Sequence, residues 1–220
     1  MLPEILGVLL IALAQASPPT APPADTPTAA VPVAADLPHG EVLYRRHCVA
    51  CHGGRAWGDG PREIPALAGQ REAYLIEQLT RFASGGRPGS AMHGPAMRDT
   101  LKATDVNRPV SIRDLAAYLA RTPASPQAEQ GPGRSLAVGR NAYLRACVGC
   151  HGENGAGIDE SAPRIGGQHF RYLLSRLREF GAAHRGLVEP AALSADEQQA
   201  LADYISRMPA SGSTPQGAAR

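Results

Sequence analysis

Apolar residues recur at the spacing of one helix face in two separate parts of the chain. Within residues 71–84, tyrosine, leucine and phenylalanine side chains fall mostly three or four positions apart, and the pattern returns within residues 169–182. Ser194, followed three residues later by Glu197, has the pattern of a capping box at the start of another helix. No run of convincing length alternates between apolar and polar residues, so we predict an all-α fold. Its other helices are predicted over residues 40–52, 112–121, 139–151 and 195–208.

The predicted helices belong to an internal repeat. Gly40 and Tyr44 recur 99 residues later as Gly139 and Tyr143. A constant offset over many positions indicates two copies of one supersecondary unit. We therefore predict domains over residues 39–123 and 135–210, a Pro/Gly-containing linker over residues 124–134, and a disordered tail over residues 211–220. Further on, the offset is 98, and it relates Pro65, Gly69, Gln70, Tyr74, Leu75, Leu79 and Phe82 to Pro163, Gly167, Gln168, Tyr172, Leu173, Leu177 and Phe180.

The beginning of the chain has the pattern of a secretory signal peptide. Residues 5–13 are apolar but too few to span a bilayer, and Ala14-Gln15-Ala16 follows as a cleavage site. We predict a signal peptide over residues 1–16 and a Pro/Ala-rich extended linker over residues 17–38. The first four residues carry no Lys or Arg, which departs from the usual pattern, and an uncleaved membrane anchor is the alternative. Membrane association is expected only through this segment.

Two copies of one short motif contain all four cysteines of the chain. They are Cys48-Val49-Ala50-Cys51-His52 and Cys147-Val148-Gly149-Cys150-His151. The C-x-x-C-H spacing is the signature of covalent attachment of c-type haem: one helical turn presents both thiols to the vinyl groups, and the histidine becomes the proximal iron ligand. A zinc site needs four ligands at one metal, and a thioredoxin-like motif needs a βαβ context that this chain lacks. We predict two thioether-linked haems (iron protoporphyrin IX).

Composition narrows the functions that fit. The formal net charge of +2 shows no basic excess of the kind used to bind nucleic acid. Aromatic residues make up only 5% of the chain, so a haem bonded into each small domain would supply much of the missing buried surface. Haem is attached to C-x-x-C-H proteins outside the cytoplasmic membrane, so we expect the chain to be exported, in agreement with the signal-peptide pattern. Most arginines are expected to be solvated, with one or two neutralising haem propionates; they include Arg71, Arg81, Arg87, Arg164, Arg171 and Arg176.

The segments after the two haem motifs resemble the dihaem cytochrome c4 family. They read Pro65-Ala-Leu-Ala-Gly-Gln70 and Pro163-Arg-Ile-Gly-Gly-Gln168-His169. The resemblance implies two tandem class I cytochrome c domains, each wrapped around its haem, with the haem edges close together. It further implies electron transfer in the bacterial periplasm, with redox partners such as a haem–copper terminal oxidase or a membrane quinol-oxidising complex.

The resemblance also assigns roles to residues around each haem. Pro65 and Pro163 are expected to accept a hydrogen bond from Nδ1–H of His52 and His151 through their carbonyl oxygens. His169 is expected to form a hydrogen bond beside or between the haems.

A methionine before the last helix usually binds the other face of the iron in such domains, and here the two repeats differ. The first repeat offers Met97, 21 residues before Tyr118, or Met92, 26 residues before it; the family's spacing favours Met97. The second has no methionine between His151 and its last helix. His184 is the strong donor in that loop, so we expect either a His/His haem or an open iron. Met208, after the last helix, is expected to be a core or surface residue.

These observations favour an electron carrier that is not itself an enzyme. If the second haem has two histidine ligands, its potential is lower, and electrons enter there and leave through the first haem. An open second haem would instead make a ligand-binding or catalytic protein. A third hypothesis is a dihaem electron-transfer subunit of a dehydrogenase complex.

Overall fold

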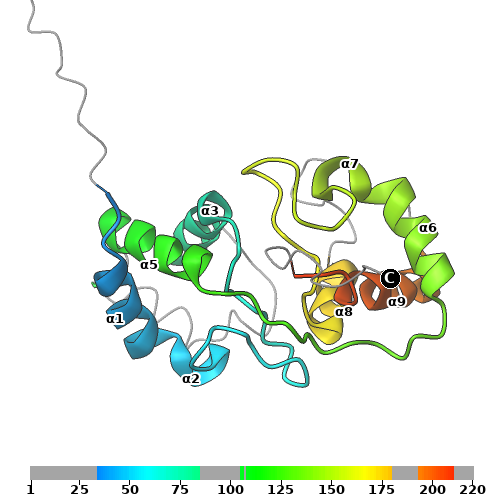
Figure 1. Cartoon of the computed structure of the whole chain (residues 1–220), viewed down its shortest axis with the longest axis horizontal. Coiled ribbons are helices and arrows are strands. Elements are labelled where there is room, and N and C mark those ends of the chain that lie inside the picture. The colour runs from blue at the N-terminus through cyan, green and yellow to red at the C-terminus, as the bar shows by residue number, and fades with distance from the viewer. Residues whose placement is uncertain (1–33, 85–104, 107, 180–192, 211–220) are drawn as a thin grey trace, which may run out of the picture. The chain divides into compact units, whose positions relative to one another are not determined.

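A computed structural model describes residues 34–84, 105–106, 108–179 and 193–210 (Figure 1). Within these ranges there is no strand, and the one β-type contact is an isolated bridge between Asp59 and Ile64. The predicted all-α fold is therefore confirmed. The first repeat contains α1 (Leu37–His47), α2 (Val49–His52), α3 (Glu72–Ala83) and α5 (Pro109–Arg121). The second contains α6 (Leu136–Ala146), α7 (Val148–His151), α8 (Phe170–Glu179) and α9 (Ala195–Ser206).

Both repeats lie in one compact unit, Ala34–Arg220. The predicted signal peptide, residues 17–33 of the predicted linker and the predicted tail lie outside the described residues. The predicted domain boundaries at residues 39, 123, 135 and 210 stay predictions. No helix in the described ranges has both the length and the apolar character that crossing a membrane requires.

The helix that carries each haem motif differs from the prediction in both start and continuity. It begins at Leu37 rather than residue 40, because the Asp36 carboxylate caps it by accepting a hydrogen bond of 2.9 Å from the His39 N–H. It is also interrupted at Cys48, which ends α1 before α2 begins. In the second repeat, Cys147 interrupts the chain between α6 and α7 in the same way. Neither cysteine is a helix breaker, so the sequence carries no signal for the interruption.

The other helices lie close to their predicted positions. α5 starts at Pro109, earlier than the predicted residue 112, since proline is well tolerated in the first turn of a helix. The capping box of Ser194 and Glu197 is present at the start of α9, as predicted.

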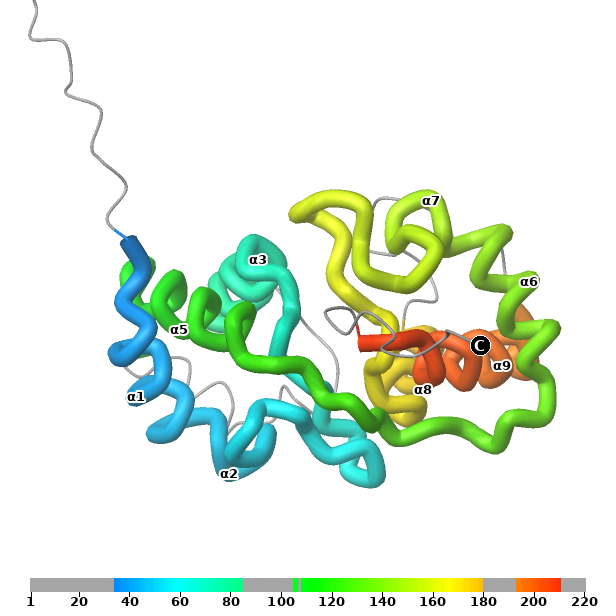
Figure 2. The backbone as a smooth tube through the Cα atoms, in the orientation of Figure 1, coloured from blue at the N-terminus to red at the C-terminus, as the bar shows by residue number. Residues whose placement is uncertain are grey.

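In each repeat the first helix packs against the last one, α1 against α5 and α6 against α9 (Figures 1 and 2). A Cβ atom on Gly40 would lie 2.2 Å from the backbone oxygen of Asp114, and one on Gly139 would lie 2.1 Å from that of Ala200. Only glycine permits this approach, which explains why Gly40 recurs as Gly139.

Each repeat has its own hydrophobic core around this helix crossing. In the first, Tyr44 packs against Tyr118 with ring centroids 5.8 Å apart, beside the fully buried Leu115. In the second, Tyr143 and Tyr204 form the equivalent pair, also at 5.8 Å. The sequence repeat is thus a repeat of core packing, and it holds the two C-x-x-C-H motifs in equivalent positions.

Candidate functional site

The histidine of the first motif is buried and held in one orientation. His52, at the end of α2, is only 4% exposed, and its Nδ1 lies 3.0 Å from the carbonyl oxygen of Pro65. A carbonyl oxygen only accepts, so Nδ1 carries the proton and the lone pair is on Nε2, the atom available to a metal. Burial lowers the pKa of His52, although the hydrogen bond to Pro65 opposes this, so the ring is neutral at pH 7.

The second motif has the same geometry. His151 is 5% exposed, and its Nδ1 lies 3.0 Å from the carbonyl oxygen of Pro163. The contact implied by the family resemblance for Pro65 and Pro163 is therefore present in the structure. Nδ1 of His151 therefore carries a proton as well.

A glycine in the left-handed backbone conformation directly follows each histidine. Gly53 and Gly152 have φ values of 76° and 70°, in the left-handed region that glycine adopts most readily. Their carbonyl oxygens accept hydrogen bonds of 2.5 Å from the hydroxyl groups of Tyr44 and Tyr143. The recurrent tyrosines thus connect each core to the residue that follows the candidate iron ligand.

The cysteines present one buried and one exposed sulfur in the first motif. Cys48 belongs to the first hydrophobic core, whereas Cys51, on α2, is exposed. Burial, assisted by Cys51, raises the pKa of Cys48 to about 12, and burial with Cys150 raises that of Cys147 to about 11. These thiols are therefore neutral, as the thioethers formed by haem attachment would be. All four cysteines lie in the described part of the chain, and none forms a disulfide there.

The donor set fits a haem in each repeat. Each motif supplies two sulfurs on one helical turn and a buried histidine whose Nδ1 is bonded to a proline carbonyl, and a haem iron would bind such a ring through Nε2. A buried amide in the first repeat also fits: both polar atoms of Gln78, on the same helix as Leu75 and Phe82, have no hydrogen-bond partner among the described residues. The carboxylate of a haem propionate would accept a hydrogen bond from Nε2 of that amide, whose burial without a partner costs about 1–3 kcal/mol. By contrast, no three metal-ligating side chains of the described ranges meet at one point, as a zinc site would need.

The predicted sixth ligands Met97, Met92 and His184 lie outside the described residues. Their roles stay predictions. Met208 is described, and the structure places it in the second hydrophobic core with 8% exposure. A core position is one of the two that the sequence analysis expects for Met208.

His169 connects the two repeats and the segment between them. Its Nε2 donates a hydrogen bond of 2.7 Å to the carbonyl oxygen of Trp57, and its Nδ1 accepts one of 3.0 Å from the Glu129 N–H. The ring is therefore neutral, with its proton on Nε2. The family resemblance implies a hydrogen bond of His169 beside or between the haems, and the structure gives this side chain backbone partners in the first repeat and in the linker.

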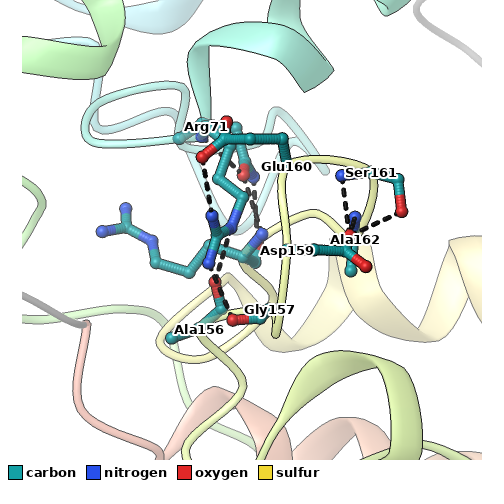
Figure 3. A network of polar contacts seen from close by, with 9 residues as sticks. Arg71, Ala156, Gly157, Asp159, Glu160, Ser161 and Ala162 are labelled. Atoms are coloured by element: carbon teal, nitrogen blue, oxygen red, sulfur yellow. Dashed lines mark hydrogen bonds and ion pairs between the residues drawn. The ribbon is translucent and has the colours of Figure 1, made fainter.

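Two arginines expected to be solvated are instead contacts between the repeats. Arg71 donates hydrogen bonds of 3.0 and 2.7 Å to the carbonyl oxygens of Ala156 and Gly157, and pairs with Glu160 at 3.2 Å (Figure 3). Arg164 donates one of 2.6 Å to the carbonyl oxygen of Ala68. The expectation was wrong for Arg71 and Arg164, because a guanidinium can satisfy backbone carbonyls that an interface removes from water.

Comparison with known proteins agrees with this geometry. A family model described as cytochrome c oxidase, cbb3-type, subunit III, matches residues 35–119. The thiosulfate dehydrogenase electron acceptor of Thiomonas intermedia (strain K12) is 31% identical over 180 residues, which are 74% of this chain and 79% of that protein. Cytochrome c4 of Thiocapsa roseopersicina is 34% identical over 193 residues, 80% of this chain and 95% of that protein. The crystal structure of reduced recombinant cytochrome c4 from Pseudomonas stutzeri has a TM-score of 0.65 and 29% identity, and covers 80% of this chain and all of that one, 100%.

The similarity extends over both repeats and so over both haem motifs. Cytochrome c4 proteins bind two c-type haems and carry electrons rather than catalyse a reaction on a substrate. The same holds for this protein: its two class I cytochrome c repeats bind two covalently attached haems and transfer electrons to and from redox partners. The chain belongs to the dihaem cytochrome c4 family.

Proposed function

We propose that this protein is a periplasmic electron carrier of a respiratory chain. Cys48 and Cys51 hold one haem through thioether bonds, and Cys147 and Cys150 hold the other. His52 and His151 are the proximal iron ligands. The observation that carries the proposal is the duplicated contact of 3.0 Å between Nδ1 of each histidine and the following proline carbonyl. Such a contact fixes the tautomer and raises the basicity of an iron-binding imidazole.

When bound, each haem supplies a one-electron iron couple. The chain supplies the surroundings that set how easily that couple is reduced. The two hydrophobic cores keep water away from the histidines, which are 4% and 5% exposed. Exclusion of water and hydrogen bonding to the ligands are the means by which a protein adjusts such a potential.

The sixth ligands distinguish the two haems in this proposal. Met97, or Met92, completes the first haem, and a thioether ligand favours ferrous iron. At the second haem, His184 is the sixth ligand of the iron, or the iron has no sixth ligand from the protein. A His/His haem has the lower potential, so electrons arrive at the second haem and depart from the first. Near-infrared and EPR spectra of the oxidised protein distinguish Met/His, His/His and high-spin haem. Two Met/His haems, or a second haem of higher potential, would overturn this assignment.

Two kinds of redox partner fit the relatives. One is a pair of membrane complexes of respiration: a quinol-oxidising complex that reduces the protein and a terminal oxidase that oxidises it. The other is a soluble dehydrogenase, because one relative is a thiosulfate dehydrogenase electron acceptor, at 31% identity over 79% of its length. Stopped-flow reduction of the oxidised protein by each donor separates the two. The true donor reduces it at a rate that falls as salt screens the encounter.

An open second haem is the alternative from a different functional class. Carbon monoxide added to the reduced protein tests it directly. A Soret change would show that the second iron takes an external ligand, whereas an unchanged spectrum would agree with His184 as the sixth ligand.

A further inference from the structure

Each repeat has a glutamine whose side chain forms hydrogen bonds with the backbone of the other repeat. Gln168 accepts a hydrogen bond of 2.9 Å from the Ala66 N–H through Oε1, and donates one of 3.0 Å to the Ala66 carbonyl through Nε2. Gln70 accepts a hydrogen bond of 2.8 Å from the Arg164 N–H through Oε1, and donates one of 2.8 Å to the Arg164 carbonyl through Nε2. Gln70 and Gln168 are equivalent in the repeat, as are Ala66 and Arg164, each pair 98 residues apart. The contact is therefore reciprocal.

The orientation of each amide is fixed. Oε1 of Gln168 accepts a second hydrogen bond, of 3.0 Å, from the His169 N–H, and Oε1 of Gln70 accepts one of 3.0 Å from the Arg71 N–H. Each oxygen thus faces two N–H donors, and each NH₂ group faces a carbonyl. Rotating either amide by half a turn would place NH₂ against two N–H groups. Gln70 and Gln168 are only 7% and 8% exposed, so the contacts are largely protected from water.

The peptide that each glutamine binds is also the peptide that holds a haem histidine. The Ala66 N–H and the Pro65 carbonyl are the two ends of one peptide group, and that carbonyl accepts from Nδ1 of His52 at 3.0 Å. The Arg164 N–H and the Pro163 carbonyl form the equivalent group, bonded to His151. One continuous chain of hydrogen bonds therefore runs from Gln168 to His52, and another from Gln70 to His151.

We propose that Gln168 and Gln70 are positioning residues, each of which lowers the reduction potential of the haem bound by the other repeat. A hydrogen bond accepted from a peptide N–H polarises that peptide and makes its carbonyl a stronger acceptor. The stronger acceptor draws the Nδ1 proton of the histidine and raises the basicity of Nε2. A more basic ligand stabilises ferric iron, which lowers the potential. The proposal rests on the function proposed above, in which His52 and His151 are the axial ligands.

Because each glutamine contacts the proline peptide of the other repeat, a substitution in one repeat should change the potential of the haem in the other. This is tested with the holoprotein. Gln168→Met keeps the length of the side chain but removes both hydrogen bonds to Ala66. The potential of the first-repeat haem should rise, while that of the second should stay. Gln70→Met should raise the potential of the second-repeat haem only. The potentials are followed separately through haem-methyl NMR resonances assigned to each repeat.

A second measurement reports the hydrogen bond itself. In protein labelled with ¹⁵N on the histidine rings, the Nδ1–H proton resonance of His52 should move upfield in Gln168→Met. That of His151 should do so in Gln70→Met. This readout is independent of electron transfer to any partner.

Arg71→Met is the matched control, because it removes contacts between the repeats that touch neither proline peptide. Arg71→Met should not shift the potential of one haem relative to that of the other. If Gln168→Met does not mature, Gln168→Leu replaces it: it also removes both hydrogen bonds to Ala66 and should raise the first-repeat potential. Equal shifts at both haems, a shift confined to the glutamine's own repeat, or no shift would each overturn the proposal. Spectra of the wild-type protein showing iron without histidine ligation would instead overturn the proposed function.

Discussion

The hydroxyl of Tyr44 donates a hydrogen bond of 2.5 Å to the carbonyl oxygen of Gly53, the residue directly after His52. Burial raises the pKa of Tyr44 far above its ordinary value, so the hydroxyl keeps its proton and stays a donor. The core of the first repeat is thereby joined to the turn that holds the proposed iron ligand. Tyr143 and Gly152 repeat this relationship in the second.

Removing that donor should weaken the first repeat. Tyr44→Phe is expected to lower the free energy of unfolding by about 0.5–1.5 kcal/mol, because it removes one of the two hydrogen bonds that the Gly53 carbonyl accepts, the other coming from the Ala56 N–H at 3.1 Å. Urea unfolding of the holoprotein, followed by the Soret band, measures the change. Tyr118→Phe is the control, since its ring contacts Tyr44 at 5.8 Å and the substitution leaves the Gly53 hydrogen bond in place. Equal losses from the two variants would contradict the role given to the Tyr44 hydroxyl.

The crossing of α1 and α5 should not tolerate a side chain at Gly40. Gly40→Ala puts a Cβ atom 2.2 Å from the backbone oxygen of Asp114, and the helices must move apart. We expect a loss of about 1–3 kcal/mol in the free energy of unfolding, the usual cost of overpacking. Gly54→Ala is a matched control, because a Cβ at Gly54 meets nothing within 4 Å. A Gly40→Ala protein as stable as Gly54→Ala would show that the helices do not approach so closely.

Asp114 should make stability depend on acid pH. Burial on its own would raise the pKa of this carboxyl, but hydrogen bonds from His39, the Asp36 N–H and Arg113 lower it overall. A carboxyl with a depressed pKa in the folded state stabilises the fold fully above its unfolded pKa of about 3.9. That contribution is lost as the pH falls through the lower folded value.

Asp114→Asn tests this dependence. The variant should be less stable than the wild type at pH 7, and the difference should shrink as the pH falls below about 4. Unfolding free energies measured at several pH values follow the difference. A gap that stays constant down to acid pH would show that ionisation of Asp114 does not matter.

Met208 should act as a core residue and not as an iron ligand. Met208→Ala is expected to lower the free energy of unfolding by about 2–5 kcal/mol through the cavity it leaves. The near-infrared and EPR signals of the second haem should stay unchanged. Met208→Leu conserves volume and should restore most of the stability. A change in the ligand signals of the second haem in Met208→Leu would identify Met208 as a ligand after all.

The repeat and the chemistry of its motifs were predictable because both are local. The offset of 98 or 99 residues pairs the positions, and the C-x-x-C-H spacing defines the sulfurs and the histidine. The interruption at Cys48 was not predictable, since no proline or glycine marks it. Nor was the start of α1, because the Asp36 cap lies inside a segment whose composition indicates a linker.

The contacts between the repeats could not be predicted from the sequence, for a different reason. Gln70 and Gln168 were visible as recurrent residues, but a repeat relates positions within each copy and does not say how the copies meet. The sequence predicts a solvated Arg71, because nothing near it in the sequence shows that the carbonyls of Ala156 and Gly157 lie within its reach. Gln70 and Gln168 recur five residues after Pro65 and Pro163, but recurrence alone does not distinguish an interface residue from a core residue.

Mass spectrometry of the denatured protein and its proteolytic peptides, after maturation in a host that attaches haem, tests the central claim most directly. We predict two haems that stay bound on denaturation, one on the peptide containing Cys48 and Cys51 and one on the peptide containing Cys147 and Cys150. Haem that is released on denaturation, or that is found on only one of these peptides, would contradict the account.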